Sequence, residues 1–256
     1  MAITDPVSIP ANINPGLSSA KQQTMITLIG NPRNGNYDNV CRPVTNPKVS
    51  RLIVTDSVGP FRVTGLRPAI ASLKEVIADI KKNEPQIFAA LGTAGMLCAR
   101  LVRNSTTAIS NHSWGTAIDL TLNGQLDVRG DGRVQVGLAS IAPIFNRHGW
   151  FWGAGFRTED GMHFEASDEK IRQWHREGQL GSTAQSQPES ALSLGDRGPE
   201  VVKLQQRLNE LGADLAVDGK MGRFTVAAVM EFQADHGLTA DGIVGSKTLA
   251  ALGLTP

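Results

Sequence analysis

The sequence contains 256 residues, of which 41% are hydrophobic, and its 25 basic and 24 acidic side chains give a formal net charge of +1. This length allows one large domain or two modest ones, and the apolar content is high enough to exclude a wholly disordered chain. The balanced charge gives no support for a nucleic-acid or membrane-surface partner that is bound through bulk charge.

The chain has two cysteines, Cys41 and Cys98. Two isolated cysteines could pair but do not make a disulfide framework, so we expect two unpaired and mostly buried thiols. The first residues lack the basic and apolar regions of a signal peptide, and no run approaches the length of a membrane-spanning helix. We therefore expect synthesis in the cytosol without membrane insertion, and release by another agent if the protein acts outside the cell.

Regular elements are clearest beyond the first fifty residues, which are rich in proline, asparagine and glycine and carry several turn signals. A helix begins at Pro68, carries apolar side chains at helical spacing, has lysines near its end and stops before Pro85. Residues 119–122 alternate in polarity, as a half-buried strand does. Further strands are expected at residues 51–55, 87–91, 94–102, 149–152 and 162–165, and further helices at 137–148 and 168–176.

The composition changes after the last of these helices. Residues 178–191 are small and polar, as flexible linkers are. Beyond them the pattern D-G-x-x-G-x-x-T occurs twice, at Asp218–Thr225 and Asp241–Thr248, and each copy is a turn that leads into a helix. We therefore predict an α+β domain with a small, mainly antiparallel sheet at residues 1–177, a linker at 178–191 and a small three-helix domain at 192–256.

Three side chains in the first domain have the chemistry of a zinc site. His112 and Asp119 stand seven positions apart, and His163 follows downstream. Two histidines and one aspartate commonly hold a catalytic zinc and leave its fourth position open for water. The spacing alone is also compatible with a His112–Asp119 hydrogen bond that only fixes a loop.

A hydrolase that uses such a site also needs a group to accept the proton of water and return it to the leaving amine. Asp160, three residues before His163, would lie on the same edge of a tight turn, and Glu159 and Glu165 are competitors. A basic side chain such as Arg100 could hold the scissile carbonyl oxygen or a substrate carboxylate.

Other conspicuous side chains have simpler explanations. Asp127 and Asp131 are interspersed with arginines and offer too few oxygens for a metal loop, so we predict a hairpin turn there. Three tryptophans could line a substrate groove, although core packing is at least as compatible with their positions. These are Trp114, Trp150 and Trp152.

The stretch Ser110–Asp119 together with Asp160-Gly-Met-His163 closely resembles the zinc D,D-peptidase family, which includes VanY-like D-Ala-D-Ala carboxypeptidases and phage L-alanyl-D-glutamate endolysins. That family shows S-x-H-x-x-G-x-A-x-D and a later E/D-x-x-H, and every fixed position is present here. The resemblance covers roughly residues 50–170 and implies a hedgehog-like α+β fold. It implies His112, Asp119 and His163 as zinc ligands.

The same resemblance implies roles for further residues. Asp160 is the expected catalytic base, where many family members carry glutamate, and Glu159 remains a minor rival. An arginine upstream of the first ligand is thought to bind substrate, and we prefer Arg100 over Arg103. Ser110 is expected to orient the metal-site loop or the His112 ring through a hydrogen bond. Trp114 is a weaker candidate for a substrate contact.

Residues 192–252 resemble the three-helix peptidoglycan-binding domain, through the segment that begins at Leu194 and the two D-G-x-x-G-x-x-T turns. The combination implies a monomeric zinc peptidase of bacterial peptidoglycan, most simply a phage-type endolysin that cleaves L-Ala–D-Glu in a host bacterium. Two alternatives stay open. One is a D-Ala-D-Ala carboxypeptidase or D,D-endopeptidase of wall remodelling, and the other is a non-catalytic wall-binding protein with a relic metal site.

Overall fold

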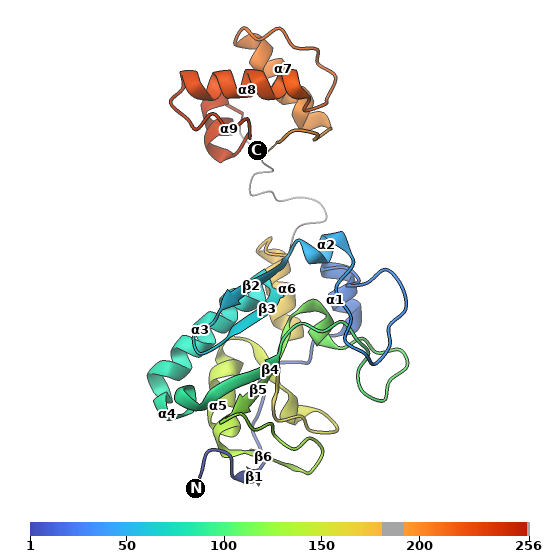
Figure 1. Ribbon diagram of the computed structural model, residues 1–256, viewed down its shortest axis with the longest axis vertical. Helices are drawn as coiled ribbons and strands as arrows, with labels where there is room; N and C mark the ends of the chain where they lie inside the picture. The colour runs from blue at the N-terminus through green and yellow to red at the C-terminus, as the bar shows by residue number, and fades with distance from the viewer. Residues whose placement is uncertain (181–191, 255–256) are drawn as a thin grey trace. The chain divides into compact units, whose positions relative to one another are not determined.

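The computed structural model describes residues 1–180 and 192–254. The chain divides into two compact units, Met1–Thr183 and Ala184–Pro256 (Figure 1). The expected linker at 178–191 falls for the most part outside the described residues. Among the described residues, no helix has both the length and the apolar character that crossing a membrane requires.

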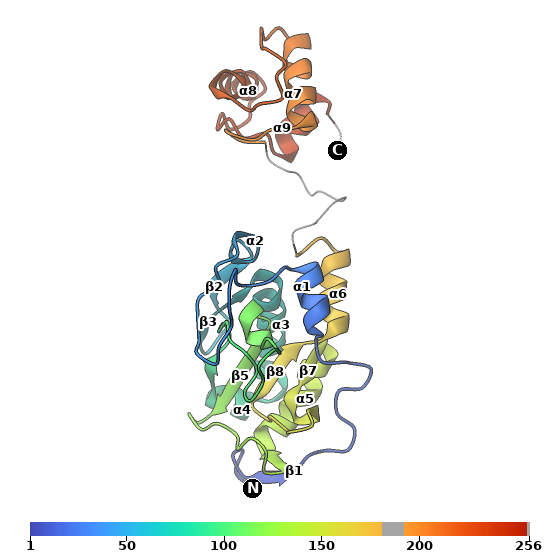
Figure 2. The same ribbon diagram turned by 90° about the vertical axis from the view of Figure 1, so that its right-hand side faces the viewer.

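The first unit is built around a four-stranded antiparallel sheet with the strand order β4-β5-β8-β7 (Figures 1 and 2). Helices α3 (Arg67–Asn83) and α5 (Val136–Arg147) pack against each other, and α5 also packs against β7. Strand β5 is buried along nearly its whole length, so the expected alternation of a half-buried strand is wrong. The strands are β4 Leu91–Gly95, β5 Ala117–Leu122, β8 His163–Ala166 and β7 Trp150–Trp152.

The remaining elements surround this sheet, and helices α5 and α6 confirm the helices expected at residues 137–148 and 168–176. A two-stranded antiparallel ribbon, β2–β3, precedes α3. The bounds are β2 Ile53–Ser57, β3 Arg62–Leu66, α3 Arg67–Asn83, α4 Pro85–Ala90, β6 Arg133–Gln135, α5 Val136–Arg147 and α6 Asp168–Arg176.

Helix α3 confirms the periodicity found in the sequence. Pro68 stands in its first turn, and its large apolar side chains from Ile70 to Ile80 are buried. The strand expected at residues 87–91 is wrong, because Pro85 opens helix α4 instead of only ending α3. The strand expected at residues 94–102 is also wrong for the most part, since β4 ends at Gly95 and only isolated β-bridges follow, at Ala99 and Leu101.

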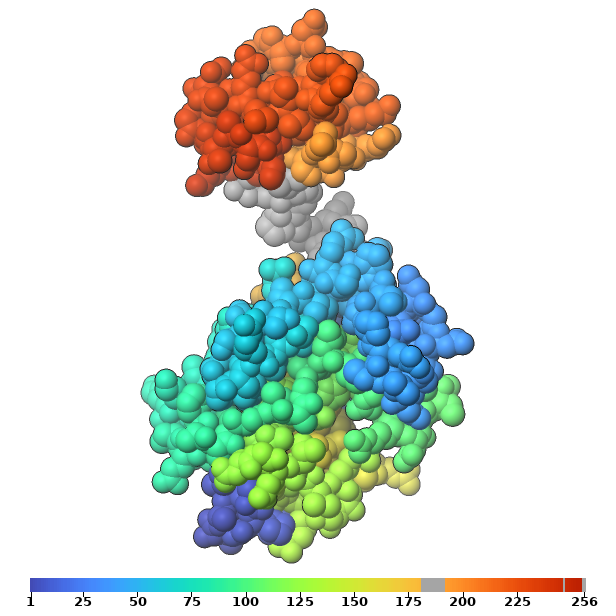
Figure 3. All heavy atoms as spheres, in the orientation of Figure 1, coloured from blue at the N-terminus to red at the C-terminus, as the bar shows by residue number. Residues whose placement is uncertain are grey.

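The N-terminal fifty residues contain three short elements that periodicity did not reveal. Strand β1 pairs antiparallel with β6, and Figure 3 shows the first residues packed beside the chain near residues 125–135. Helix α1 packs beside α6 in both ribbon views (Figures 1 and 2). The elements are β1 Pro6–Ser8, α1 Gln22–Leu28 and α2 Pro47–Ser50.

Cys41 and Cys98 form a disulfide, which corrects the expectation of two unpaired and mostly buried thiols. Cys41 is exposed and Cys98 is half-buried. The neighbouring residues Arg42 and Ala99 exchange two backbone hydrogen bonds, of 3.0 and 3.2 Å. This pairing sets the two cysteines side by side, and the sequence offers no signal for it because 57 positions separate them.

The second unit contains helices whose buried faces form a separate hydrophobic core. The two D-G-x-x-G-x-x-T turns share one hydrogen-bond pattern. Gln205 donates to Asp218 Oδ1 (2.9 Å) and Thr225 Oγ1 (3.2 Å), and it accepts from the backbone N–H of Gly219 (2.9 Å). In the second turn the equivalent residues are Gln233, Asp241, Thr248 and Gly242. The helices are α7 Pro199–Glu210, α8 Arg223–Asp235 and α9 Ser246–Leu252.

Candidate metal centre

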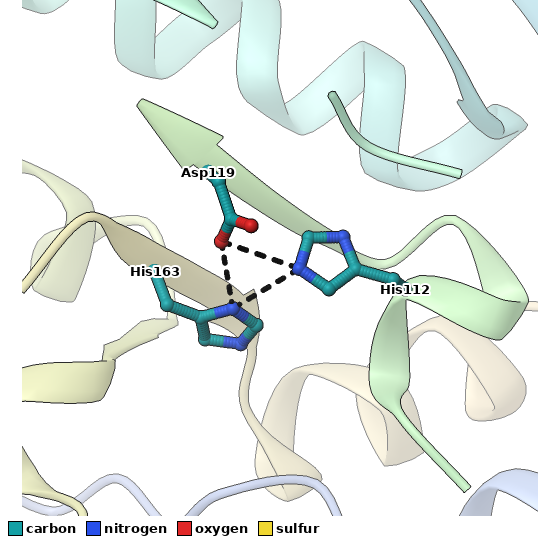
Figure 4. A group of neighbouring side chains, drawn as sticks. All are labelled: His112, Asp119 and His163. Carbon is teal, nitrogen blue, oxygen red and sulfur yellow. Dashed lines mark hydrogen bonds and ion pairs between the residues drawn. The ribbon is translucent and has the colours of Figure 1, made fainter. Parts of the chain in front are cut away.

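The three predicted zinc ligands lie together at the middle of the sheet (Figure 4). His112 belongs to a short 3-10 helix, η1 Asn111–Trp114, that leads into β5. Asp119 lies on β5 and His163 is the first residue of β8. The antiparallel register pairs Asp119 directly with His163, so strand pairing brings together two residues that are far apart in the sequence.

The distances among the facing atoms fit a tetrahedral cation. Asp119 Oδ1 lies 3.2 Å from His112 Nε2 and 3.0 Å from His163 Nδ1, and the two nitrogens are 3.2 Å apart. Two donors that each lie about 2.05 Å from one tetrahedral zinc are about 3.3 Å from each other. The side chains therefore stand close to the separations that zinc requires.

Hydrogen bonds on the far side of each ring fix which nitrogens face this point. His112 Nδ1 lies 3.0 Å from the carbonyl oxygen of Met96, and His163 Nε2 lies 2.9 Å from Glu165 Oε2. Both partners accept hydrogen bonds, so in the neutral rings these nitrogens carry the protons. The lone pairs of the other two nitrogens then face Asp119, and three acceptors converge without a donor. A cation satisfies this arrangement.

The electrostatics of the cluster point the same way. Burial alone would lower the pKa of His163, but hydrogen bonds to Asp119 and Glu165 outweigh it and raise that pKa to about 10. Burial alone would raise the pKa of Asp119, but hydrogen bonds from His112 and His163 hold it well below its usual range. The two carboxylates thus attract positive charge to this point, as a proton or as a metal ion.

Glu165 is a residue whose role the sequence interpretation missed. Its buried carboxylate accepts hydrogen bonds from Ser19 Oγ (2.7 Å), Ala20 N (3.0 Å) and Asn111 Nδ2 (2.9 Å), besides contacting His163. A carboxylate with this many partners orients the ring and is not free to carry protons, which corrects the expectation that Glu165 competes as the catalytic base. The spacing H-x-E on a strand places both side chains on one face and could have indicated this role.

Gly115, between the first two ligands, is required by close packing. Its φ of 65° lies in the left-handed region, and a Cβ at this position would lie 2.6 Å from the Cα of Gly65. Gly115 also accepts a hydrogen bond from Leu66 N through its carbonyl oxygen. The turn that carries His112 into β5 is therefore held against the end of β3, where Gly65 lies, by two glycines in contact.

A pocket of about 440 Å³ opens over the metal centre, and Asp160 lines it together with the three ligands. Asp160 Oδ2 lies 3.2 Å from Arg129 Nε. Within the described part of the chain, the buried Oδ1 has no hydrogen-bond partner. Burial, reinforced by Asp119, raises the pKa of Asp160 against the opposing effects of His163 and Arg129. A carboxylate with a free oxygen and a raised pKa is suited to accept a proton.

Glu159, the rival base, lies outside the residues that line this pocket. Its carboxylate accepts a 2.6 Å hydrogen bond from the backbone N–H of Gly132, and its carbonyl oxygen accepts one of 3.2 Å from Gly130. The turn at Asp127 and Asp131 is thus held by Glu159. It is not the predicted hairpin, because β6 after the turn pairs with β1 and not with a strand that leads into the turn. Among the described residues it does not contribute to a metal-binding group either.

Both candidate substrate-binding arginines, Arg100 and Arg103, line the pocket. Arg100 is half-buried and donates from Nη1 to the carbonyl oxygen of Leu101 at 3.0 Å, whereas Arg103 is exposed. Arg129 and Arg157 also line the pocket, and the sequence interpretation assigned neither of them to the site.

Two weaker expectations have different outcomes. Ser110 lines the pocket, and its backbone holds the metal-site loop through hydrogen bonds to Arg100 and Ser113, whereas the His112 ring is oriented by Met96. Trp114 is fully buried and donates to the carbonyl oxygen of Gly30 at 2.7 Å, so it packs in the core and does not contact substrate. Trp150 and Trp152 are fully buried as well.

The fold and the site together define a metallopeptidase type of centre, and comparisons with known proteins agree with it. Residues 103–166 match the family described as D-alanyl-D-alanine carboxypeptidase. Residues 197–252 match the family described as putative peptidoglycan binding domain. These matches confirm both resemblances identified in the sequence. With the His–Asp–His cluster they support a zinc metallopeptidase as the class of the first unit.

Individual relatives are similar over short segments only. The zinc D-Ala-D-Ala carboxypeptidase of Streptomyces albus G is 48% identical over 60 residues, which are 22% of this chain and 24% of that protein. The N-acetylmuramoyl-L-alanine amidase CwlM of Mycobacterium tuberculosis is 46% identical over 56 residues, covering 22% and 14%. A crystal structure of Burkholderia AP3 phage endolysin is 52% identical, covers 25% of this chain and 24% of that one, and has a TM-score of 0.24. The chain thus spans a quarter or less of each relative.

Proposed function

We propose that this protein is a zinc-dependent peptidase that hydrolyses the L-Ala–D-Glu bond in the stem peptides of bacterial peptidoglycan. The observation that carries the proposal is the convergence of three metal-facing lone pairs in a pocket that also contains Asp160 with an unpartnered oxygen. The choice of the L-Ala–D-Glu bond rests on the motif resemblance to phage L-alanyl-D-glutamate endolysins. The proposal also includes a hedgehog-like fold for the first unit.

His112, Asp119 and His163 would hold the zinc, and their contacts with Met96 and Glu165 keep both rings oriented. Zinc in such a site polarises a carbonyl group and lowers the pKa of a water molecule. The protein's own part in the chemistry is proton transfer. Asp160 accepts a proton from the attacking water and passes it to the nitrogen of the leaving amine, so that the amide becomes a carboxylic acid and an amine.

An arginine stabilises the negative charge that develops on the scissile carbonyl oxygen. Arg100 remains our preferred residue, because its half-buried side chain is held by its hydrogen bond to the carbonyl oxygen of Leu101. A donor that is fixed before the reaction loses little freedom when charge develops, and it therefore contributes more than a mobile one. Arg103 is the second choice, since its side chain is exposed.

The C-terminal domain would keep the enzyme on its polymeric substrate. A peptidoglycan-binding module beside a catalytic domain raises the local concentration of cleavable bonds without any new contact at the active site. We propose that the protein acts on the cell wall in this way, as a phage-type endolysin that is set free by the host lysis machinery.

A bond to D-Ala is the second candidate, and a specific observation favours it. The family that matches residues 103–166 is described as D-alanyl-D-alanine carboxypeptidase. The metal centre and Asp160 serve either reaction, since both hydrolyse an amide. Cleavage at D-Ala would fit an enzyme of wall remodelling.

Mass spectrometry of purified peptidoglycan after digestion, with and without a zinc chelator, tests the proposal. New D-Glu amino termini that disappear with chelator support cleavage at L-Ala–D-Glu. Loss of terminal D-Ala, or opened D-Ala cross-links, would support the zinc mechanism and show that the cleaved bond is one to D-Ala. Binding to the wall without new ends, in several wall types, would leave a non-catalytic wall-binding protein with a relic metal site.

Three further variants address the assignment of the residues. Ala in place of His163 or Asp119 should remove both stoichiometric zinc and wall cleavage, because two ligands do not make a stable site. Asp160→Asn should keep zinc and lose cleavage, because an amide cannot accept the proton. Wall cleavage by Asp160→Asn at the wild-type rate would contradict the role of Asp160.

A further inference from the structure

The pocket over the metal centre carries more positive charge than the proposed reaction needs. Its lining includes three carboxylates and four arginines, so it has one net positive charge with neutral histidines, and three with a divalent ion. The arginines come from three separate stretches of the chain and line one pocket. They are Arg100, Arg103, Arg129 and Arg157. Such a surplus indicates an anionic ligand.

Arg129 differs from the other three because it touches the proposed base. Its Nε lies 3.2 Å from Asp160 Oδ2, and its side chain is 30% exposed. A guanidinium group has five N–H donors, so an ion pair made through Nε leaves both Nη atoms available. In the described residues no ion pair or hydrogen bond engages those Nη atoms with another acceptor. Arg129 can therefore bind a second carboxylate beside the first.

The turn that carries Arg129 is fixed on both sides. Gly130 and Gly132 donate their backbone N–H groups to Glu159, the neighbour of Asp160, at 3.2 and 2.6 Å. Asp127 Oδ1 accepts a hydrogen bond of 2.8 Å from the backbone N–H of Gln135. The turn and the base therefore form one fastened unit, and Arg129 does not depend on a loose loop for its position.

The proposed chemistry places a carboxylate within reach of this arginine. Asp160 returns its proton to the leaving nitrogen, so the atoms bonded to that nitrogen lie close to Asp160. In an L-Ala–D-Glu substrate, the carbon that bears the leaving nitrogen also bears the free α-carboxylate of D-Glu. In a substrate that ends in D-Ala, the same carbon bears the terminal carboxylate.

We propose that Arg129 is a specificity-determining residue that pairs with Asp160 through Nε and binds this substrate carboxylate through its Nη atoms. The protein then selects substrates whose leaving residue carries a free α-carboxylate and discriminates against those in which it is a carboxamide. A carboxylate accepts two parallel hydrogen bonds from a guanidinium, whereas a carboxamide turns one N–H₂ group toward it. The inference rests on the proposed function, because it takes the leaving group from that reaction.

The test compares two synthetic stem peptides that differ at one group. One carries L-Ala–γ-D-Glu with a free α-carboxyl, and the other carries the α-carboxamide at that position. For a bond to D-Ala, the matching pair is the C-terminal acid and its amide. The ratio of kcat/KM for acid over amide is measured with the full chain loaded with zinc. We expect a ratio of about 10 to 100 for the wild type.

Two variants locate the discrimination at Arg129. Arg129→Gln removes the charge and should reduce the ratio to within about threefold of unity, chiefly by slowing the acid substrate. Arg129→Lys keeps the charge but lacks the two parallel N–H donors of a guanidinium, and it should reduce the acid-to-amide ratio of kcat/KM to less than about tenfold. Arg133→Gln is the matched control. Its guanidinium donates to the carbonyl oxygen of Pro6 and does not line the pocket, so its ratio should equal that of the wild type.

The possible outcomes separate the inference from the function beneath it. Cleavage of both peptides at equal rates by the wild type would overturn the inference and leave the peptidase intact. If both Arg129 variants keep the wild-type ratio, the inference is also overturned, and another arginine must select for the carboxylate. No cleavage of either member of either pair, with zinc bound, would refute the proposed function itself. Bound zinc and thermal melting of each variant show whether it is folded.

Discussion

Replacing Glu165 with glutamine should weaken zinc binding although Glu165 is not a ligand. The change keeps the shape of the side chain and converts one acceptor oxygen into an N–H₂ donor. One carboxylate oxygen of Glu165 faces Ser19 Oγ and Ala20 N, and the other faces Asn111 Nδ2 and His163 Nε2. Donors therefore stand on both sides of the group.

Either placement of the amide has a cost. If the N–H₂ group faces His163, the ring must present an acceptor at Nε2, and its proton moves to Nδ1, the atom that faces the metal. If it faces Ala20, two N–H donors oppose each other in a buried site. Loss of such an orienting carboxylate typically weakens metal affinity about 10- to 100-fold. This corresponds to about 1–3 kcal/mol.

The assay is a competition titration of zinc between the protein and a chromophoric chelator. Glu169→Gln is the matched control, since the Glu169 carboxylate accepts hydrogen bonds from the backbone and hydroxyl of Ser18, at 2.9 and 2.6 Å, and does not line the pocket. That variant should bind zinc as the wild type does. If Glu165→Gln binds zinc within about twofold of the control, the orienting role of Glu165 is wrong.

Three further results are expected. Gly115→Ala should lower the free energy of unfolding by about 2–4 kcal/mol in denaturant titration, because the new Cβ meets the Cα of Gly65 at 2.6 Å and φ is positive. Cys41→Ser should lower it by about 2–4 kcal/mol, and the difference from the wild type should vanish when a reductant opens the Cys41–Cys98 bond. Burial raises the pKa of Asp168, but hydrogen bonds outweigh it and hold the pKa below its ordinary value of 3.8. The stabilisation is therefore complete above that value, and the Tm difference between Asp168→Asn and wild type should shrink as the pH falls below about 4.

Local sequence patterns were sufficient to predict an element when that element buries one apolar face. The apolar side chains of α3 recur at helical spacing, and α6 begins with Ser167 as its cap, so both could be predicted from the sequence. The short strand β1 could not, because three residues are stabilised only by pairing with β6, more than a hundred positions later. The Cys41–Cys98 disulfide was not predicted for the same reason, because it depends on pairing between segments 57 positions apart.

The residues of the site also fall into those that the sequence predicted and those that it did not. The predicted ligands His112, Asp119 and His163 lie together, and the motif that indicated them is short and specific. Arg129 lies in a turn whose sequence reads as an ordinary hairpin, and it reaches Asp160 only because Glu159 fastens that turn beside it. Such contacts between separate segments leave no periodic trace in the sequence.

Three carboxylates within seven residues show how packing distributes roles that residue type leaves open. Glu165 is saturated with hydrogen bonds and orients His163, and Glu159 accepts from a backbone N–H and holds a turn. Asp160 has one oxygen paired with Arg129 and, among the described residues, one without a partner. A carboxylate whose lone pairs are already engaged would have to break those bonds to accept a proton. The free oxygen, and not the proximity of the residue to His163 in sequence, is therefore what makes Asp160 the candidate base.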